Sequence, residues 1–140
     1  MRYLLDTNIF LYFATDIQLL DKNVLSILED AENTLYLSVE SLKELVQFFR
    51  KQKIKPKQWK TEIELLNAVE KDFGISILPL KKEHLHTYAK LSINLVQDHK
   101  DPSDHIIISQ AITDKITLIS SDRKFEFYQK QHLKFIFNSK

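Results

Sequence analysis

The sequence predicts an α/β fold in which helices cover both faces of a parallel sheet. Short apolar strand segments alternate along the chain with segments of helical periodicity, an order typical of such folds. No repeat and no low-complexity linker interrupts this order, so we expect a single domain over residues 1–140. With 44% hydrophobic and 28% charged residues, a chain of this length can bury an ordinary core.

The elements follow from local patterns of apolar residues. Predicted strands are residues 3–5, 35–37, 75–78, 116–119 and 133–137. Predicted helices begin near Ile9, span residues 16–31, run from Ser38 to about residue 51, and span residues 57–73 and 82–95; one more begins at Asp101 and a short one follows Arg123. Pro102 suits the first turn of a helix and Gly74 suits a helix end.

The composition excludes several classes of protein. The chain has no cysteine, which rules out disulfides and cysteine-ligated metal sites. One glycine, Gly74, cannot form a glycine-rich phosphate loop. No apolar run of about 18 residues is present, and Asp6 and Asn8 interrupt any signal-peptide pattern, so we expect a cytoplasmic protein that does not enter a membrane. A net charge of +1 means that nucleic acid would need a local basic patch.

Asp6, Thr7 and Asn8 directly follow the first predicted strand. Ligands of open α/β sheets gather at the carboxyl ends of the strands, so a carboxylate here is well placed for chemistry. The alternative is that Asp6 or Thr7 only caps the next helix, and this segment alone favours the cap.

Asp122 follows the predicted strand 116–119 as Asp6 follows the first strand. If both strands are parallel, both carboxylates lie at one edge of the sheet. Helix capping by Asp122 or by the preceding serines, Ser120 and Ser121, is the ordinary alternative.

Asp104 lies near the start of the predicted helix that begins at Asp101. It shares a helix face with the apolar residues at i+3, i+4 and i+7, which are Ile107, Ile108 and Ala111. That face should pack on the sheet, so Asp104 is expected to point towards the sheet. The alternative is a capping pair, with Asp101 as the cap and Asp104 in the first turn.

Converging carboxylates repel one another, and a divalent cation resolves that repulsion. Oxygen ligands suit Mg²⁺ or Mn²⁺, and such an ion lowers the pKa of bound water and stabilises charge on a phosphoryl oxygen. The pattern therefore predicts hydrolysis of phosphodiester bonds. Spacing alone cannot decide whether Glu44 or Glu40 joins these acids.

Four segments resemble those of the PIN-domain family, and within it the VapC-type toxin ribonucleases. Leu5-Asp6-Thr7-Asn8 is similar to the family's opening motif, and Ser38 with Lys43-Glu44-Leu45 to its second acidic element. Residues 101–111 are similar to the third element, and Ile119-Ser-Ser-Asp122 with Phe125 and Tyr128 to the last. The resemblance covers essentially the whole chain, and it favours Glu44 over Glu40.

The resemblance implies a three-layer α/β/α sandwich around a mostly parallel sheet of four to five strands. It implies a metal-dependent endoribonuclease with catalytic residues Asp6, Glu44, Asp104 and Asp122, of which Asp6, Asp104 and Asp122 bind Mg²⁺ or Mn²⁺. Supporting roles fall to Thr7, Asn8, Ser121 and Asp101. His105 stands where the family often has arginine, so the resemblance does not imply a fixed positive charge at this position. The implied partners are an RNA substrate, a small antitoxin and a second copy of the chain.

Residues 50–60 carry six basic residues and no acid. They could bind an RNA backbone through Arg50, Lys51, Lys53, Lys55 and Lys57, with Trp59 stacking on a base. The alternative, which we favour for Trp59, is packing in the core. The other histidines, His84, His86, His99 and His132, have no metal-ligand spacing and are expected at the surface.

Two other functions stay open. A PIN-like module that binds RNA or protein without catalysis would need the fold but not the acids. Another metal-dependent phosphohydrolase could also place an aspartate after the first strand. An aspartyl-phosphate enzyme would need a second aspartate where Asn8 stands, so this class ranks last.

Overall fold

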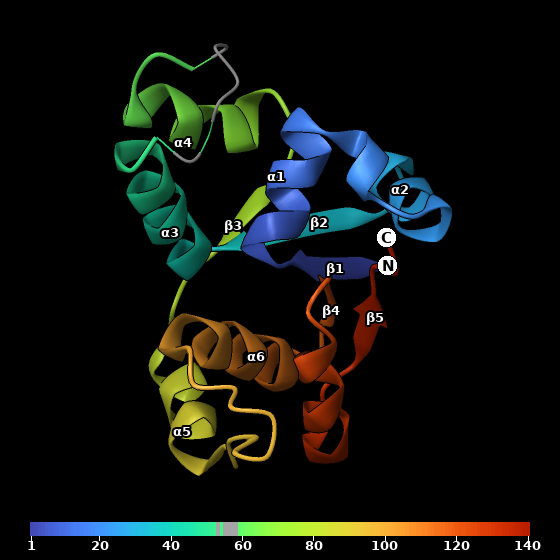
Figure 1. The fold of residues 1–140 in the computed structure, drawn as a ribbon, viewed down its shortest axis with the longest axis vertical. Coiled ribbons are helices and arrows are strands. Elements are labelled where there is room, and N and C mark those ends of the chain that lie inside the picture. The colour runs from blue at the N-terminus through green and yellow to red at the C-terminus, as the bar shows by residue number, and fades with distance from the viewer. Residues whose placement is uncertain (53, 55–58) are drawn as a thin grey trace.

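The computed structural model describes residues 1–52, 54 and 59–140. These residues form a five-stranded sheet in the order β3-β2-β1-β4-β5, and all neighbouring strands pair in parallel. The strands are β1 (Arg2–Leu5), β2 (Thr34–Ser38), β3 (Ser76–Leu78), β4 (Thr117–Ser120) and β5 (Phe135–Phe137). Helices flank the sheet (Figure 1), so the predicted α/β class with a parallel central sheet is confirmed.

Helices cover the two faces of the sheet in two groups (Figure 1). One face carries α1 (Thr7–Thr15), α2 (Lys22–Glu29), α3 (Val39–Arg50) and α4 (Glu62–Lys71). The other carries α6 (Pro102–Asp114) and the 3₁₀ helix η2 (Arg123–Gln131), with α5 (Lys82–Lys90) packed on α6. Strand alternation explains the two cores: Tyr3 and Leu5 face the first group, whereas Leu4 faces the second.

The predicted helix over residues 16–31 is wrong in its first part. Residues Ile17–Leu19 form a short 3₁₀ turn, and Leu20 is extended. The side chain of Asp21 accepts a hydrogen bond from the Val24 amide at 2.7 Å, so Asp21 caps α2 and sets its start.

Three other predicted helices are shorter or tighter than expected. The helix predicted over residues 82–95 ends at Lys90. The helix predicted over residues 57–73 begins at Glu62 because Thr61 caps it, its hydroxyl accepting from the Glu64 amide at 3.1 Å. The short helix after Asp122 is the 3₁₀ helix η2.

The carboxyl ends of the parallel strands meet at one edge of the sheet. β1 lies in the centre, and the Asp6 amide donates to the Ile119 carbonyl at 2.9 Å, so Asp6 continues the β1–β4 pairing. This bond brings the residues that follow β1 next to those that follow β4. No helix in the described part of the chain has the length and apolar character to cross a membrane.

Candidate active site

A cleft of about 440 Å³ opens at the carboxyl edge of the sheet. It brings together residues from the ends of β1 and β4 and from α1, α3 and α6. Tyr12, Phe48 and Arg123 line the cleft. So do all eight predicted catalytic and supporting residues, which are Asp6, Thr7, Asn8, Glu44, Asp101, Asp104, Ser121 and Asp122.

Asp6 both caps α1 and lines the cleft. Its Oδ1 accepts from the Thr7 amide at 2.8 Å, and its Oδ2 accepts from the Ser120 hydroxyl at 2.8 Å. The residue is only 7% exposed. Burial raises the pKa of Asp6 to about 7, with a further contribution from the negative charge of Asp104, while the two hydrogen bonds act in the opposite direction. The cap and the pocket acid are therefore one residue.

Ser120 connects the two acids that follow the strands. Its hydroxyl donates to Asp6 and accepts from the Asp122 amide at 3.0 Å. From the sequence, Ser120 was predicted only as a candidate helix cap. The cap of η2 is instead Asp122, which accepts from the Lys124 amide at 2.9 Å. Ser121 also lines the cleft, and its hydroxyl accepts from the Asn138 amide group at 2.8 Å.

Thr7 holds Glu44 in the cleft. The Thr7 hydroxyl donates to Glu44 Oε1 at 2.7 Å and lies 2.8 Å from the Ser41 hydroxyl, which can donate to it. Glu44 is half-buried. Burial raises the pKa of Glu44, the Thr7 hydrogen bond lowers it, and the charge of Asp104 raises it again.

Glu40 has different partners from Glu44. It accepts from the Ser103 hydroxyl at 2.8 Å and forms an ion pair with Lys43 at 2.5 Å. Glu40 does not line the cleft. Of the two glutamates, Glu44, which the family resemblance favours, is therefore the one that lines the cleft.

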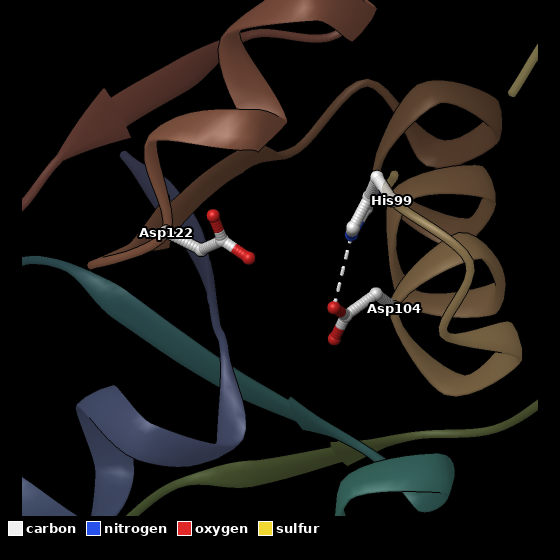
Figure 2. Close-up of side chains that lie close together, drawn as sticks. All are labelled: His99, Asp104 and Asp122. Carbon is white, nitrogen blue, oxygen red and sulfur yellow. Dashed lines mark hydrogen bonds and ion pairs between the residues drawn. The ribbon is translucent and has the colours of Figure 1, made fainter. Parts of the chain in front are cut away.

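Asp104 and Asp122 approach each other from opposite sides of the cleft (Figure 2). Asp101 caps α6, accepting from the Ser103 amide at 2.9 Å, and Asp104 follows in the first turn. Burial raises the pKa of Asp104, and a hydrogen bond with His99 opposes this effect. Single ligand atoms of Asp104, Asp122 and His99 lie within 4.8 Å of one another.

The prediction that His84 and His99 lie at the surface is wrong. His84 is buried and lies 3.1 Å from both carboxylate oxygens of Asp114. His99 is 3% exposed, and its Nε2 lies 3.0 Å from Asp104 Oδ2. No sequence signal marked His99, because it lies in the loop before α6, where spacing does not fix direction. His86 and His132 are exposed as expected.

His105 does not place a charge in the cleft. It is buried, and its Nε2 lies 2.9 Å from the His99 carbonyl oxygen, to which it donates. Burial lowers the pKa of His105, with the His99 ring as a second cause. The residue is therefore neutral at pH 7, and its role is to hold the loop that carries His99.

The predicted RNA-binding segment is only partly described. Arg50 and Lys51 are exposed, and Arg50 pairs with Glu62 at 3.5 Å. Lys53, Lys55 and Lys57 lie outside the described residues. Trp59 is 7% exposed and packs in the core of the α1–α4 face, as predicted. RNA binding by this segment stays a prediction.

The donor set fits a hard divalent cation. The cleft offers carboxylate oxygens from Asp6, Glu44, Asp104 and Asp122, the ligands that Mg²⁺ and Mn²⁺ prefer. Burial and mutual repulsion raise the pKa values of Asp6, Glu44 and Asp104. A cation held among these acids would remove that repulsion, which gives the cleft a physical reason to bind one.

Asp6→Asn is expected to stabilise the metal-free protein increasingly as the pH rises from about 4 to about 7. The folded state binds the Asp6 proton more tightly than the unfolded state, whose pKa is near 3.8. The tighter binding of this proton therefore stabilises the folded state fully below pH 4, and the stabilisation is lost by about pH 7. The loss is on the order of a few kcal/mol.

Urea unfolding in EDTA at several pH values measures this effect. The free energy of unfolding of Asp6→Asn minus that of the unmutated protein should grow across the interval. A difference that is constant with pH would show that folding does not raise the pKa of Asp6.

Comparison of the sequence with models of known protein families identifies the class of protein to which this fold and acidic cleft belong. The model of the PIN domain family matches residues 3–131. The chain therefore belongs to the PIN-domain family, as its motifs predicted. No protein of curated function matches the sequence significantly.

Solved structures of VapBC complexes share the fold. VapBC2 from Rickettsia felis, bound to a DNA fragment from its promoter, is 24% identical with a TM-score of 0.73, covering 98% of each chain. VapBC-1 from nontypeable Haemophilus influenzae is 21% identical with a TM-score of 0.68, covering 100% of each chain. VapBC-5 from Mycobacterium tuberculosis, of the VapBC family of toxin–antitoxin systems, is 19% identical with a TM-score of 0.61, covering 97% of this chain and 98% of the other. At these identities the likeness concerns the fold.

Proposed function

We propose that this protein is a Mg²⁺- or Mn²⁺-dependent endoribonuclease and the toxin of a toxin–antitoxin pair. One observation carries the proposal: Asp6, Glu44, Asp104 and Asp122, from four separate parts of the chain, line one cleft. Membership of the PIN-domain family supports it. Acids that repel one another are costly to the fold, so their assembly at one site favours a functional role.

Each acid has a role that its contacts support. Asp6, Asp104 and Asp122 would hold the cation, which when bound supplies an acidified water molecule and stabilises charge on the phosphoryl oxygen. Glu44 has one oxygen fixed by Thr7, so its other oxygen can take a proton from the attacking water. Burial raises its pKa, which makes the carboxylate a stronger base.

Arg123 provides a positive charge at the rim of this acidic cleft. Its guanidinium carbon lies 4.2 Å from the centre of the Phe137 ring, and Nη1 lies 3.2 Å from Glu126 Oε1. These contacts hold the guanidinium group where an RNA phosphate can approach the cleft.

The proposed partners follow from the structural neighbours. Three of the solved structures that share the fold are of VapBC proteins, one of them described as a member of the VapBC family of toxin–antitoxin systems. This likeness supports a small antitoxin as partner of this chain. The homodimer and the cytoplasmic location implied by the resemblance remain proposals.

Cleavage of a labelled single-stranded RNA tests the proposal. The purified chain should cut with Mg²⁺ or Mn²⁺, stop in EDTA, and resume when Mn²⁺ is restored. A double variant, Asp6→Asn with Asp104→Asn, purified identically, controls for contaminating ribonuclease. Cleavage that persists in EDTA or in the double variant would refute the proposed site. RNA that is bound but never cut would favour the non-catalytic module instead.

A further inference from the structure

We propose that His99 is a positioning residue for Asp104, held in place by Tyr128. A chain of hydrogen bonds joins the Tyr128 hydroxyl to His99 Nδ1, and His99 Nε2 to Asp104 Oδ2 (Figure 2 shows the second bond). These hydrogen bonds fix one carboxylate oxygen of Asp104 and leave the other free to bind the cation. This inference rests on the proposed function in assigning Asp104 to that cation.

The positions of the hydrogens follow from the buried Tyr128 hydroxyl. Tyr128 is 0% exposed, so its phenolic hydrogen needs a protein acceptor. Its oxygen already accepts from the Asn94 amide at 3.2 Å, which offers no acceptor in return. Among the described contacts of this hydroxyl, His99 Nδ1 at 2.8 Å is the acceptor. Nδ1 is therefore unprotonated, and the neutral ring carries its hydrogen on Nε2.

The hydrogen on Nε2 determines what His99 can do at the cleft. The nitrogen donates to Asp104 Oδ2 at 3.0 Å. With a hydrogen in place it has no lone pair for a metal, although it lies within 4.8 Å of oxygens of Asp104 and Asp122. His99 thus acts on the metal site through Asp104. Partners of ligands in this position commonly change metal affinity by about 10–100-fold.

The ring of His99 cannot easily turn away from this geometry. It packs edge-on against the rings of His105 and Tyr128, with ring centroids 4.8 and 5.4 Å away, and lies 5.4 Å from Phe125. Its backbone amide donates to the Asn94 carbonyl at 3.0 Å, and its carbonyl accepts from His105 Nε2. Backbone and ring are therefore both fixed.

The tautomer of His99 is the first test, and it needs neither RNA nor metal. Long-range ¹H–¹⁵N NMR spectra of the full chain in EDTA should show the Nε2–H form for His99. Tyr128→Phe removes the donor to Nδ1, whereas Asp104 still accepts from Nε2. The ring should keep its hydrogen on Nε2, and the Nδ1 resonance should shift because its hydrogen bond is lost. A His99 ring with its hydrogen on Nδ1 in the unmutated protein would overturn the inference.

Mn²⁺ affinity, measured by calorimetry, is the second test. His99→Leu should weaken binding about tenfold. His99→Gln, whose amide nitrogen can occupy the place of Nε2, should stay within about threefold of the unmutated protein, since it keeps the donor. His86→Leu alters an exposed histidine on α5 and should leave the affinity unchanged. Thermal unfolding of each variant checks its folding. If His99→Leu does not fold, His99→Asn replaces it, because the shorter side chain cannot place a donor at the position of Nε2 and should also weaken binding about tenfold.

In a protein that binds Mn²⁺, three further results would overturn the inference. One is equal affinity of His99→Leu and the unmutated protein; another is an equal loss in His99→Leu and His99→Gln. The third is a ¹⁴N coupling of a directly bound imidazole in the pulsed EPR spectrum of the Mn²⁺ protein. A protein that binds no Mn²⁺ would refute both this inference and the metal part of the proposed function. Mn²⁺ binding that responds to His99 as expected, without RNA cleavage, would refute the ribonuclease alone.

Discussion

Asp104→Asn is expected to abolish metal-dependent RNA cleavage, with a fall in kcat/KM of about 10³-fold or more. The substitution keeps the shape of the side chain, and its amide oxygen can still accept from His99. It removes a negative charge from the cleft, and with it one of the proposed charged ligands of the cation. A loss of several kcal/mol of transition-state stabilisation corresponds to about a thousandfold in rate. Initial rates at saturating and limiting Mn²⁺ measure it.

Asp98→Asn is the matched control for this prediction. Asp98 lies in the loop before α6, its side chain is 76% exposed, and it pairs with Lys100 at 3.0 Å. Its backbone is left-handed, with φ of 56°, a conformation that asparagine tolerates. Its cleavage rate should stay within about twofold of the unmutated protein. Equal losses in the two variants would show that the net charge of the protein, and not the carboxylate of Asp104, controls the rate.

Glu44→Gln is expected to lower kcat about 100-fold while KM for RNA changes little. Glutamine can still accept from the Thr7 hydroxyl, so the side chain keeps its place. It cannot take a proton from water, and loss of a general base typically costs 10²–10⁴-fold in rate. Single-turnover cleavage rates at several RNA concentrations separate kcat from KM.

Glu40→Gln tests whether the position of the glutamate matters. Glu40 lies one turn before Glu44 on α3, but its contacts are with Ser103 and Lys43 outside the cleft. The variant should cut RNA within about threefold of the unmutated rate. If it loses as much activity as Glu44→Gln, the assignment of the base is wrong.

Sequence periodicity could predict the position of those acids that depends only on the local strand or helix. Asp6 comes directly after β1 and Asp122 comes two residues after the end of β4, and parallel pairing then places both at one edge. Asp104 was predicted from its helix face, and Ile107, Ile108 and Ala111 on that face are indeed buried. These inferences needed only local patterns and the rule that strand ends meet.

Contacts between distant elements could not be predicted in the same way. Glu44 lies off the apolar stripe of α3, and it is half-buried because Thr7 of α1 lies against it. His99 lies in a loop, where no period tells which way a side chain points. Its burial depends on Tyr128, 29 residues further on. The start of α2 was missed because the cap at Asp21 interrupts a pattern that is otherwise helical.

The hydrogen bond between Ser120 and Asp6 has a consequence for biosynthesis. Its two residues are 114 positions apart, and the strand that carries Asp6 lies at the centre of the sheet between β2 and β4. Translation delivers the segment containing Asp6 first, but the β4 strand that completes its surroundings emerges only about a hundred residues later. Pairing over so long a loop is also slow. A ribosome-bound nascent chain that lacks β4 has no closed cleft, so the acids assemble only after nearly all of this sequence has been made.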